Sequence, residues 1–250
     1  MSRRHSYLAP NIEGGFIAFA HRGGSHLHPE NSIAAFRHAW DVGFRYMETD
    51  VQVTADGVLV AFHDDDLRRT CAIPQLISQM SWAEVSQARI NGREAIPTLA
   101  ELMEEFPEAY FNIDAKTDAT VEPLIAHLQR TSALPRVCIG AFSHSRLVKI
   151  RSQLGAAVCT TASPREVAQW LLGHIPPGPS CLQVPIRYGK IPVVTERRIR
   201  QAQKAQCPVH VWTVDDANSM QQLIDIGVHG IMTDRGDILR NVAQLNSLWD

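Results

Sequence analysis

The sequence has no long apolar run and no excess of either charge. No stretch of its 250 residues approaches the ~20 consecutive apolar residues that a membrane-spanning helix needs, so we expect no transmembrane segment. The formal net charge is −2 and basic residues form no run, which argues against a nucleic-acid partner. Residues 7–15 contain no apolar core of the kind found in secretory signals, so we expect no such signal.

Cysteine is also scarce. The five cysteines are an odd number, are scattered along the chain and stand mostly in apolar runs. Reduced thiols in the core of a cytoplasmic protein therefore explain them better than a disulfide framework does. The five positions are Cys71, Cys138, Cys159, Cys181 and Cys207.

What remains is an ordinary globular composition, with 45% apolar and 20% charged residues. No linker or internal repeat divides the chain, so residues 1–250 are expected to form a single domain. Predicted strands and helices alternate, which at this length indicates an α/β protein of the (β/α)8 TIM-barrel class. The eight expected strands are residues 16–20, 48–53, 110–116, 136–142, 156–161, 180–184, 208–214 and 230–233.

Two acidic residues stand two positions apart in the second of these strands. Residues 48–53, Glu-Thr-Asp-Val-Gln-Val, alternate and are rich in β-branched side chains. Because alternate strand residues share a face, Glu48 and Asp50 project together and repel each other unless a cation lies between them. Oxygen ligands favour Mg2+, Ca2+ or Mn2+ over zinc. The other interpretation of such a pair is a solvated strand face.

A predicted β-hairpin brings a histidine toward this pair. Asp56-Gly57 is a strong two-residue turn signal between the apolar residues 51–53 and 58–60. With those two residues at the centre of the turn, Asp50 faces His63, with Cβ atoms about 4.5–5.5 Å apart. A three-residue turn would shift this register by one residue. In the first register His63 is a candidate general acid or base.

His21 and Arg22 follow the first predicted strand, whose nearly continuous apolar run is typical of a strand covered on both faces. The Pro-Glu-Asn-Ser sequence that comes next carries the signals of a helix start. The guanidinium of Arg22 can bind two phosphate oxygens at once. Glu30 and Asn31 either cap this helix only or also hold His21 and Arg22 in place.

The third predicted strand places Asn112, Asp114 and Lys116 on one face. Asp114 can complete a three-carboxylate metal site, and Lys116 can supply positive charge to a phosphoryl oxygen. The alternative is an Asp–Lys pair on a hydrated strand.

Two residues near other strand ends carry further expectations. Trp212 ends a predicted strand, and we expect it to line a pocket at that end of the barrel. Asp234 follows the last predicted strand, and we expect it to cap the final helix.

Taken together, these motifs resemble those of the glycerophosphodiester phosphodiesterase family, which has a PI-PLC-like TIM-barrel fold. The resemblance spans nearly the whole chain in the family's order and spacing, so it is more specific than any one motif. The matching residues are His21-Arg22-Gly23, Pro29-Glu30-Asn31-Ser32, Glu48-Thr49-Asp50, Thr54-Ala55-Asp56-Gly57, His63-Asp64, Ile96-Pro97-Thr98-Leu99, Asn112-Ile113-Asp114-Ala115-Lys116, Trp212-Thr213-Val214 and Gly230-Ile231-Met232-Thr233-Asp234.

The resemblance implies a role for each candidate residue. One divalent metal ion, Mg2+, Ca2+ or Mn2+, is implied as the cofactor. The implied roles are metal binding by Glu48, Asp50 and Asp114, acid–base catalysis by His21 and His63, phosphate binding by Arg22 and Lys116, and lining of the alcohol pocket by Trp212.

The implied reaction is metal-dependent hydrolysis of a small glycerophosphodiester to glycerol 3-phosphate and an alcohol, in lipid and glycerol metabolism. One histidine deprotonates the nucleophile and the other protonates the leaving alcohol. The nucleophile is either water or the glycerol 2-hydroxyl, and the latter gives a cyclic phosphate. Two other interpretations stay open: a lysophospholipase D built on the same barrel, and a non-catalytic barrel that binds phosphodiesters.

The chain departs from the family pattern in three places, of which Ser32 in place of the more usual Thr matters little, because both residues cap helices. Asp114 stands where the family usually has Glu, and a carboxylate shorter by one methylene lengthens the third metal bond or leaves it water-mediated. Residues 65–95 correspond to the family's insertion after the second strand but match it weakly. The sequence therefore predicts neither the preferred head group nor the oligomeric state.

Overall fold

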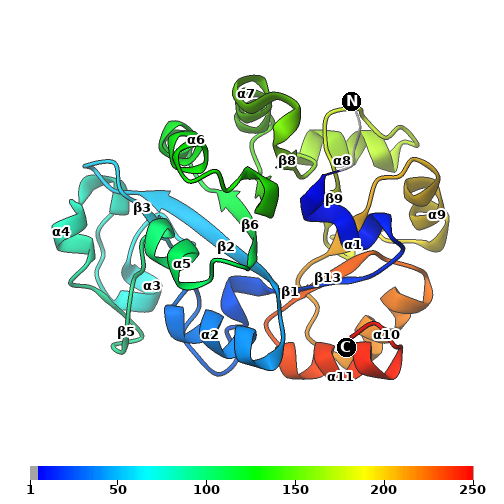
Figure 1. The fold of residues 1–250 in the computed structure, drawn as a ribbon, viewed down its shortest axis with the longest axis horizontal. Helices are drawn as coiled ribbons and strands as arrows, with labels where there is room; N and C mark the ends of the chain where they lie inside the picture. The colour runs from blue at the N-terminus through cyan, green and yellow to red at the C-terminus, as the bar shows by residue number, and fades with distance from the viewer. Residues whose placement is uncertain (1–4, 250) are drawn as a thin grey trace.

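The computed structural model describes residues 5–249. Its main parallel sheet runs in the order β8-β7-β6-β2-β1-β13-β12-β9. Strands that follow one another in the sequence are therefore neighbours in the sheet, once the short strands outside this path are left aside. A bridge between Thr161 and Cys181 links the two outer strands, β8 and β9. The predicted (β/α)8 fold class is confirmed (Figure 1). The strands are β1 (Ile17–Ala20), β2 (Tyr46–Val53), β6 (Tyr110–Ala115), β7 (Val137–Gly140), β8 (Cys159–Thr160), β9 (Leu182–Val184), β12 (Val209–Val211) and β13 (Gly230–Thr233).

Helices surround this sheet and connect its strands (Figure 1). Their starts follow capping rules: Thr98 and Ser163 each accept a hydrogen bond from the backbone of a glutamate three residues later, and that glutamate bonds back to the cap. The helices are α1 (Ala9–Ile12), α2 (Ile33–Val42), α5 (Leu99–Glu105), α6 (Val121–Arg130), α7 (His144–Leu154), α8 (Pro164–Leu171), α9 (Glu196–Lys204), α10 (Ala217–Asp225) and α11 (Gly236–Leu245), with 3-10 turns η1 (Ser6–Leu8), η2 (His21–Gly23), η4 (Asp118–Thr120), η5 (Leu134–Arg136) and η6 (Gly155–Ala157). None of the described helices is long and apolar enough to cross a membrane.

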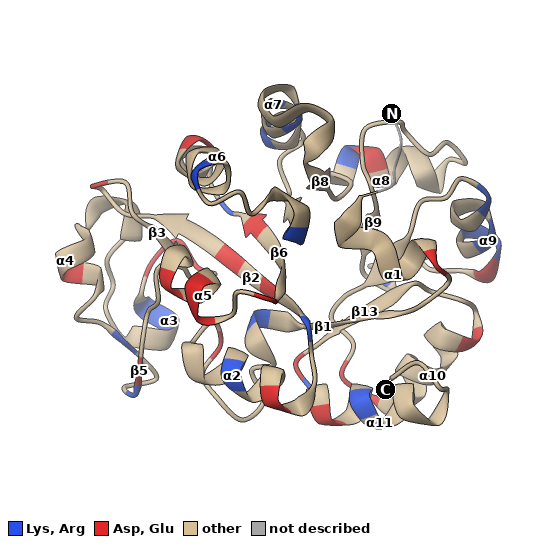
Figure 2. Ribbon diagram, viewed as in Figure 1, with Lys and Arg blue, Asp and Glu red and all other residues tan. Residues whose placement is uncertain are grey.

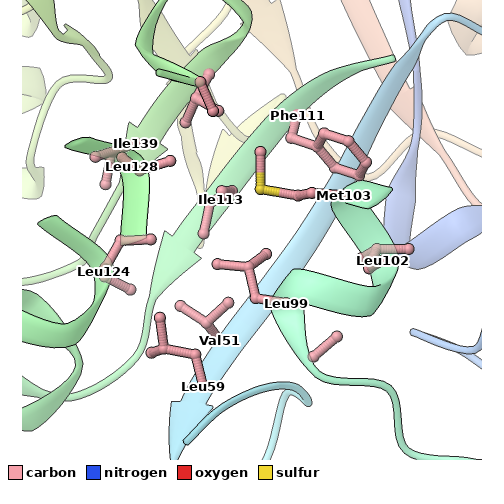
Figure 3. Packing of buried hydrophobic residues seen from close by; sticks show 14 of the residues in the cluster. Val51, Leu59, Leu99, Leu102, Met103, Phe111, Ile113, Leu124, Leu128 and Ile139 are labelled. Atoms are coloured by element: carbon pink, nitrogen blue, oxygen red, sulfur yellow. The ribbon is translucent and has the colours of Figure 1, made fainter. Parts of the chain in front are cut away.

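The outer face of the sheet is buried by these helices. Figure 3 shows α5 and α6 side chains packed against β2, β6 and β7. This burial of apolar surface removes it from water and holds the strands in register. The contributing residues include Val51, Leu99, Leu102, Met103, Phe111, Ile113, Leu124, Leu128 and Ile139.

The inside of the barrel is closed at one end by η1. Tyr7 from η1 is fully buried and packs edge-on against Tyr46, with 5.2 Å between ring centroids. The Tyr46 hydroxyl donates a hydrogen bond to the Tyr7 carbonyl at 2.8 Å. Since Tyr46 and Tyr110 are the first residues of their strands, η1 fills the N-terminal end of the barrel.

The predicted hairpin forms between β2 and the antiparallel strand β3 (Leu59–Ala61). Its turn has three residues, because Thr54 N bonds to Val58 O at 3.0 Å and Gly57 takes a left-handed φ of 86°. The Thr54 hydroxyl supports this turn by accepting from Val58 N at 2.9 Å and donating to Asp56 at 2.6 Å. The prediction of a two-residue turn is therefore wrong, because the turn is one residue longer and shifts the strand register by one residue.

Residues 65–95 form a small segment beside the hairpin (Figure 1). The segment contains α3 (Arg68–Cys71), the 3-10 turn η3 (Ile77–Gln79), α4 (Trp82–Val85), β4 (Arg89–Ile90) and β5 (Glu94–Ala95). Its apolar side chains, among them Leu67, Ile77 and Ile90, pack against Val60 and Phe62 of the hairpin. A second hairpin, β10 (Arg187–Tyr188) and β11 (Ile191–Pro192), follows β9.

Candidate active site

The candidate residues gather at the C-terminal ends of β1, β2 and β6. His21 directly follows β1, and Asp114 lies next to the last residue of β6. Asp50 and Asp114 are partners in the parallel β2–β6 ladder, so their carboxylates lie at the same level of the sheet. Figure 2 shows acidic residues on both strands. This is the end of a barrel at which parallel strands present side chains to a shared pocket.

Lys116 lies between two of these carboxylates. Its Nζ is 2.6 Å from Asp50 Oδ1 and 2.6 Å from Asp114 Oδ2. Burial raises the pKa of Asp50, but the charges of Lys116 and Arg22 outweigh this and hold the pKa below its ordinary value. The Asp114–Lys116 pair is therefore a partly buried ion pair inside the site, which rules out the hydrated-strand alternative.

Glu48 is a buried carboxylate whose ionisation is disfavoured. Only 5% of it is exposed, and burial followed by repulsion from Asp50 raises its pKa to about 7. Buried neighbouring carboxylates are stabilised by a cation, and an all-oxygen donor set suits a hard divalent ion. These carboxylates are oxygen donors of the type that Mg2+, Ca2+ and Mn2+ prefer. Their burial shows that the solvated-face alternative for Glu48 and Asp50 is wrong.

His21 is held by a residue from the far end of the chain. Its Nδ1 lies 2.9 Å from Asp234 Oδ1, and Asp234 also accepts a hydrogen bond from the Ser25 hydroxyl at 2.9 Å. On its other side, His21 Nε2 is 3.8 Å from Glu48 Oε2. Burial lowers the pKa of His21, but the hydrogen bond with Asp234 and the charge of Glu48 outweigh burial and raise it.

Asp234 does not cap the final helix, contrary to expectation. The N-cap position of α11 is Arg235, which makes no side-chain cap. The Asp234 carboxylate instead turns toward His21, because β13 and β1 are neighbours and their ends meet.

Arg22 turns its backbone and its side chain toward the carboxylates. Its backbone N donates to Glu48 Oε2 at 3.1 Å, its Nη1 donates to Glu30 Oε1 at 3.1 Å, and its Nε is 3.1 Å from Asp50 Oδ2. The backbone at these two residues is left-handed, with φ of 49° at Arg22 and 85° at Gly23, and it directs both the backbone N and the side chain of Arg22 toward the carboxylates. A Cβ at Gly23 would lie 2.8 Å from the Ala35 Cβ, so only glycine fits there.

Glu30 and Asn31 do more than cap a helix. The N-cap of α2 is Ser32, whose hydroxyl accepts from Ala35 N. Asn31 Nδ2 donates to Asp50 Oδ2 at 3.1 Å, and its Oδ1 accepts from the Thr49 hydroxyl at 2.8 Å. The interpretation in which these residues also hold Arg22 is confirmed by its contact with Glu30, whereas the side-chain partners of His21 are Asp234 and Glu48, and Asn31 instead holds Asp50.

His63 does not stand opposite Asp50, as the two-residue turn predicted. The three-residue turn places Phe62 there, with Phe62 N donating to Asp50 O at 3.0 Å. His63 lies one position further, and its Nδ1 is 2.6 Å from Asp64 Oδ1. Asp64 in turn accepts a hydrogen bond from Arg69 Nε at 2.6 Å. A neighbouring carboxylate therefore orients this imidazole.

Trp212 directly follows β12 at the same end of the barrel. Its ring packs edge-on against Phe142, which follows β7 and is 67% exposed, with 6.0 Å between centroids. The two rings form an apolar part of the rim.

The site also contains three residues that the sequence analysis did not assign to it. Asp64 and Asp234 each hold a histidine, and Arg69 from the 65–95 segment pairs with both Asp64 and Glu30. An acidic residue beside a candidate histidine, or at a strand's C-terminal end, is the signal that could have identified the first two. Arg69 has no such signal, since its position depends on how the segment folds.

Comparison with known proteins gives consistent results. Residues 21–238 match the glycerophosphoryl diester phosphodiesterase family. A Mycobacterium tuberculosis protein named probable glycerophosphodiester phosphodiesterase 2 is 37% identical, over 97% of each chain. A crystal structure from Silicibacter pomeroyi has a TM-score of 0.83 at 19% identity, covering 98% of this chain and 99% of the other. An Oleispira antarctica phosphodiesterase, solved with its product sn-glycerol 3-phosphate, has a TM-score of 0.78 at 21% identity, covering 93% and 98%. These two structures support the fold.

Proposed function

The chain belongs to the glycerophosphoryl diester phosphodiesterase family, and on this premise we propose that it hydrolyses glycerophosphodiesters to glycerol 3-phosphate and an alcohol. The observation that carries the proposal is the group of buried carboxylates at adjoining strand ends, with His21 held beside Glu48. This arrangement supplies a cation site and a proton donor at one place.

We propose that one divalent ion binds to Glu48, Asp50 and Asp114. When bound, such an ion polarises the phosphoryl oxygens of the substrate. Arg22 and Lys116 neutralise the carboxylates in this structure, and both side chains are 16–18% exposed. Arg22 and Lys116 then bind phosphoryl oxygens and stabilise the negative charge that develops on them.

The two histidines take different roles in this proposal. His21 is the general acid, because Asp234 holds its Nδ1, leaves Nε2 free to protonate the leaving oxygen, and raises the pKa of the ring. His63 is the general base, with Asp64 holding Nδ1 and leaving Nε2 to accept the proton of the nucleophile. Detection of a cyclic phosphate by 31P NMR during turnover would identify the glycerol 2-hydroxyl as that nucleophile, and its absence would identify water.

The 65–95 segment is proposed to belong to the same catalytic unit, so that residues 1–250 act as one domain. It borders the site through Arg69, and an open cleft beside it is lined by Glu30, Asn91 and Arg93. Polar and charged residues in this cleft suit a polar head group. Trp212 lines the alcohol pocket, where it and Phe142 supply an apolar surface.

The test measures release of glycerol 3-phosphate from glycerophosphocholine by EDTA-treated protein, before and after return of Mg2+, Ca2+ or Mn2+. We expect no release after EDTA and recovery with at least one ion. Asp50→Asn should abolish the recovery, whereas Asp66→Asn, outside the carboxylate group, should leave it intact. Release from lysophosphatidylcholine alone would instead establish a lysophospholipase D, and no release from either substrate would contradict the proposal.

A further inference from the structure

Three cysteine side chains meet inside the barrel. Cys138 lies in β7, Cys159 begins β8, and Cys181 directly precedes β9. Their Sγ atoms all lie within 4.8 Å of one another, and those of Cys138 and Cys181 are 3.9 Å apart. All three thiols are fully buried. In residues 5–249, no other group of three or more His, Cys, Asp or Glu side chains brings its ligand atoms so close together.

The distances between the Sγ atoms are close to those between sulfur ligands bound to one metal ion. A metal–sulfur bond of about 2.3 Å puts the sulfurs of a trigonal or tetrahedral site roughly 3.8–4.0 Å apart. The distance between Cys138 and Cys181 already has this value, and Cys159 needs to move by less than 1 Å. The three sulfurs are therefore preorganised for coordination.

A buried tyrosine packs in the same cluster as the three thiols, because Tyr7, Cys138, Cys159 and Cys181 share one group of buried side chains. Tyr7 is fully buried, and its hydroxyl makes no hydrogen bond among the described residues. Burial raises the pKa of Tyr7 well above its ordinary value, so the hydroxyl stays a protonated donor. A buried donor without an acceptor is costly, and a metal-bound thiolate would be an acceptor for it.

We propose that Cys138, Cys159 and Cys181 form a binding site for one soft d10 metal ion, Cu+ or Zn2+. Thiolates select such ions, whereas the carboxylates at the strand ends select hard ones. Three sulfurs without a fourth His, Cys, Asp or Glu in the described residues suit three-coordinate Cu+, while Zn2+ would recruit a fourth ligand. Asn112 is the partner of Cys138 in the β6–β7 register, stands two residues before Asp114, and accepts a hydrogen bond from Gln183 Nε2 at 2.8 Å.

The metal would join the segments that meet at the seam between β8 and β9. Strand β8 has only two residues, and the seam is formed by the isolated Thr161–Cys181 bridge and by hydrogen bonds from Ser180 N to Thr160 O and from Ala162 N to Cys181 O. The three cysteines belong to three consecutive segments across this seam. An ion bound to all three would cross-link them, and binding to the folded state alone would raise stability.

The test compares protein purified under reducing conditions from cells grown with added copper or zinc. EDTA and desalting then remove ions from the carboxylates, and the metal left per chain is measured by mass spectrometry. We expect about one ion per chain in the wild type, set by the three thiolates. Cys71→Ser, which alters a cysteine outside the cluster, should retain the ion, and Cys159→Ser should lose it.

Two further measurements keep the test decisive if Cys159→Ser does not fold. The metal-loaded wild type should melt roughly 5–10 °C above the metal-free protein at a free metal concentration about a hundredfold above Kd. X-ray absorption at the metal edge should show sulfur neighbours at about 2.3 Å. A higher content of copper than zinc would indicate that the ion is bound by the three sulfurs alone. A higher content of zinc would indicate that the ion has a fourth ligand. No retained metal, or only oxygen neighbours, would overturn the proposal.

Discussion

His21 Nδ1 lies 2.9 Å from Asp234 Oδ1, although the two residues are 213 positions apart. The contact exists because β1 and β13 are neighbouring strands, with Ala20 opposite Thr233. Each of the two residues directly follows its strand. The closure of the barrel therefore brings the first candidate catalytic residue to a carboxylate that fixes the orientation of its ring and stabilises its protonated form.

Asp234→Asn should lower kcat by roughly 10–100-fold with little change in KM, because the ring of His21 loses its orienting carboxylate. Asp234 raises the pKa of His21, so its loss lowers that pKa. If His21 is the acid, activity falls as pH rises through its pKa, and this limb of the kcat profile should move to lower pH. Asp216→Asn, at the exposed N-cap of α10, is the matched control. An unchanged pH profile would contradict the role of Asp234.

His21→Ala and His63→Ala should each reduce kcat by roughly 10²–10⁴-fold if they are the acid and the base. His174→Ala replaces an exposed histidine and should leave kcat unchanged. The measurement is initial rate at saturating metal and substrate. A loss of less than tenfold in both variants would remove the acid–base assignment.

Lys116→Met should change two quantities in opposite directions. The ammonium lies between Asp50 and Asp114, where it competes with a metal ion, so its removal should lower the metal concentration for half-maximal activity. Loss of its charge from the phosphoryl group should lower kcat/KM by on the order of 10²-fold. Lys116→Arg, which keeps the charge, should change both values less. A higher metal requirement in Lys116→Met would show that Lys116 does not compete with the ion.

Local patterns were enough to predict that the candidate residues at the ends of β1, β2 and β6 lie together, but not the contributions of Asp64, Asp234 and Arg69. In a parallel barrel the C-terminal ends of all strands lie on one side, so residues that end apolar runs come together without knowledge of long-range contacts. This is why His21 was identified from sequence as a neighbour of Glu48, and Asp50 as a neighbour of Asp114.

Register and distant partners could not be predicted in the same way. The pairing of Asp50 depended on a turn whose length is set by the Thr54 hydroxyl, which a two-residue signal does not reveal. The cysteines stood in separate apolar runs, and only the parallel register puts Cys138 opposite Cys159. Their nearly equal spacing, 138 to 159 and 159 to 181, was the available signal, since it matches one strand–helix unit.

Glu166→Gln should destabilise the protein in a pH-dependent way. Arg151 Nη1 donates to Glu166 Oε1 at 2.6 Å, and the two side chains are 16% and 6% exposed. Burial raises the pKa of Glu166, but hydrogen bonds from Arg151 and Ser163 outweigh burial and lower it. Removing the carboxylate should reduce the free energy of unfolding at pH 7 by roughly 2 kcal/mol.

The lowered pKa fixes the pH window of this effect. The carboxylate's contribution is full above its unfolded pKa of 4.5 and is lost as pH falls through the lower folded value. Urea unfolding at several pH values should therefore show wild type and Glu166→Gln converging below pH 4.5. Glu122→Gln, which removes an exposed ion pair between Glu122 of α6 and Lys149 of α7, should unfold like the wild type. A difference that is constant at all pH values would contradict the ion-pair explanation.

Gly23→Ala should disturb both stability and activity, and Gly14→Ala separates the two causes. Both glycines have φ of 85°, so an alanine at either position pays the left-handed strain of roughly 1–2 kcal/mol. A Cβ at Gly14 meets nothing within 4 Å, whereas at Gly23 it would lie 2.8 Å from the Ala35 Cβ and 2.9 Å from Phe36 N. Gly23→Ala should therefore cost about 1–3 kcal/mol more than Gly14→Ala in chemical denaturation.

Activity should separate the two variants further. The clash at Gly23 pushes on the peptide of Arg22, whose backbone N donates to Glu48 and whose Nε lies beside Asp50. We expect Gly23→Ala to lose on the order of 10²-fold in kcat/KM, because a displacement of about 1 Å in a positioning group has that effect. Gly14→Ala should keep wild-type rates at a temperature where both proteins are folded. Equal activity in the two variants would show that the tight turn after β1 does not position Arg22.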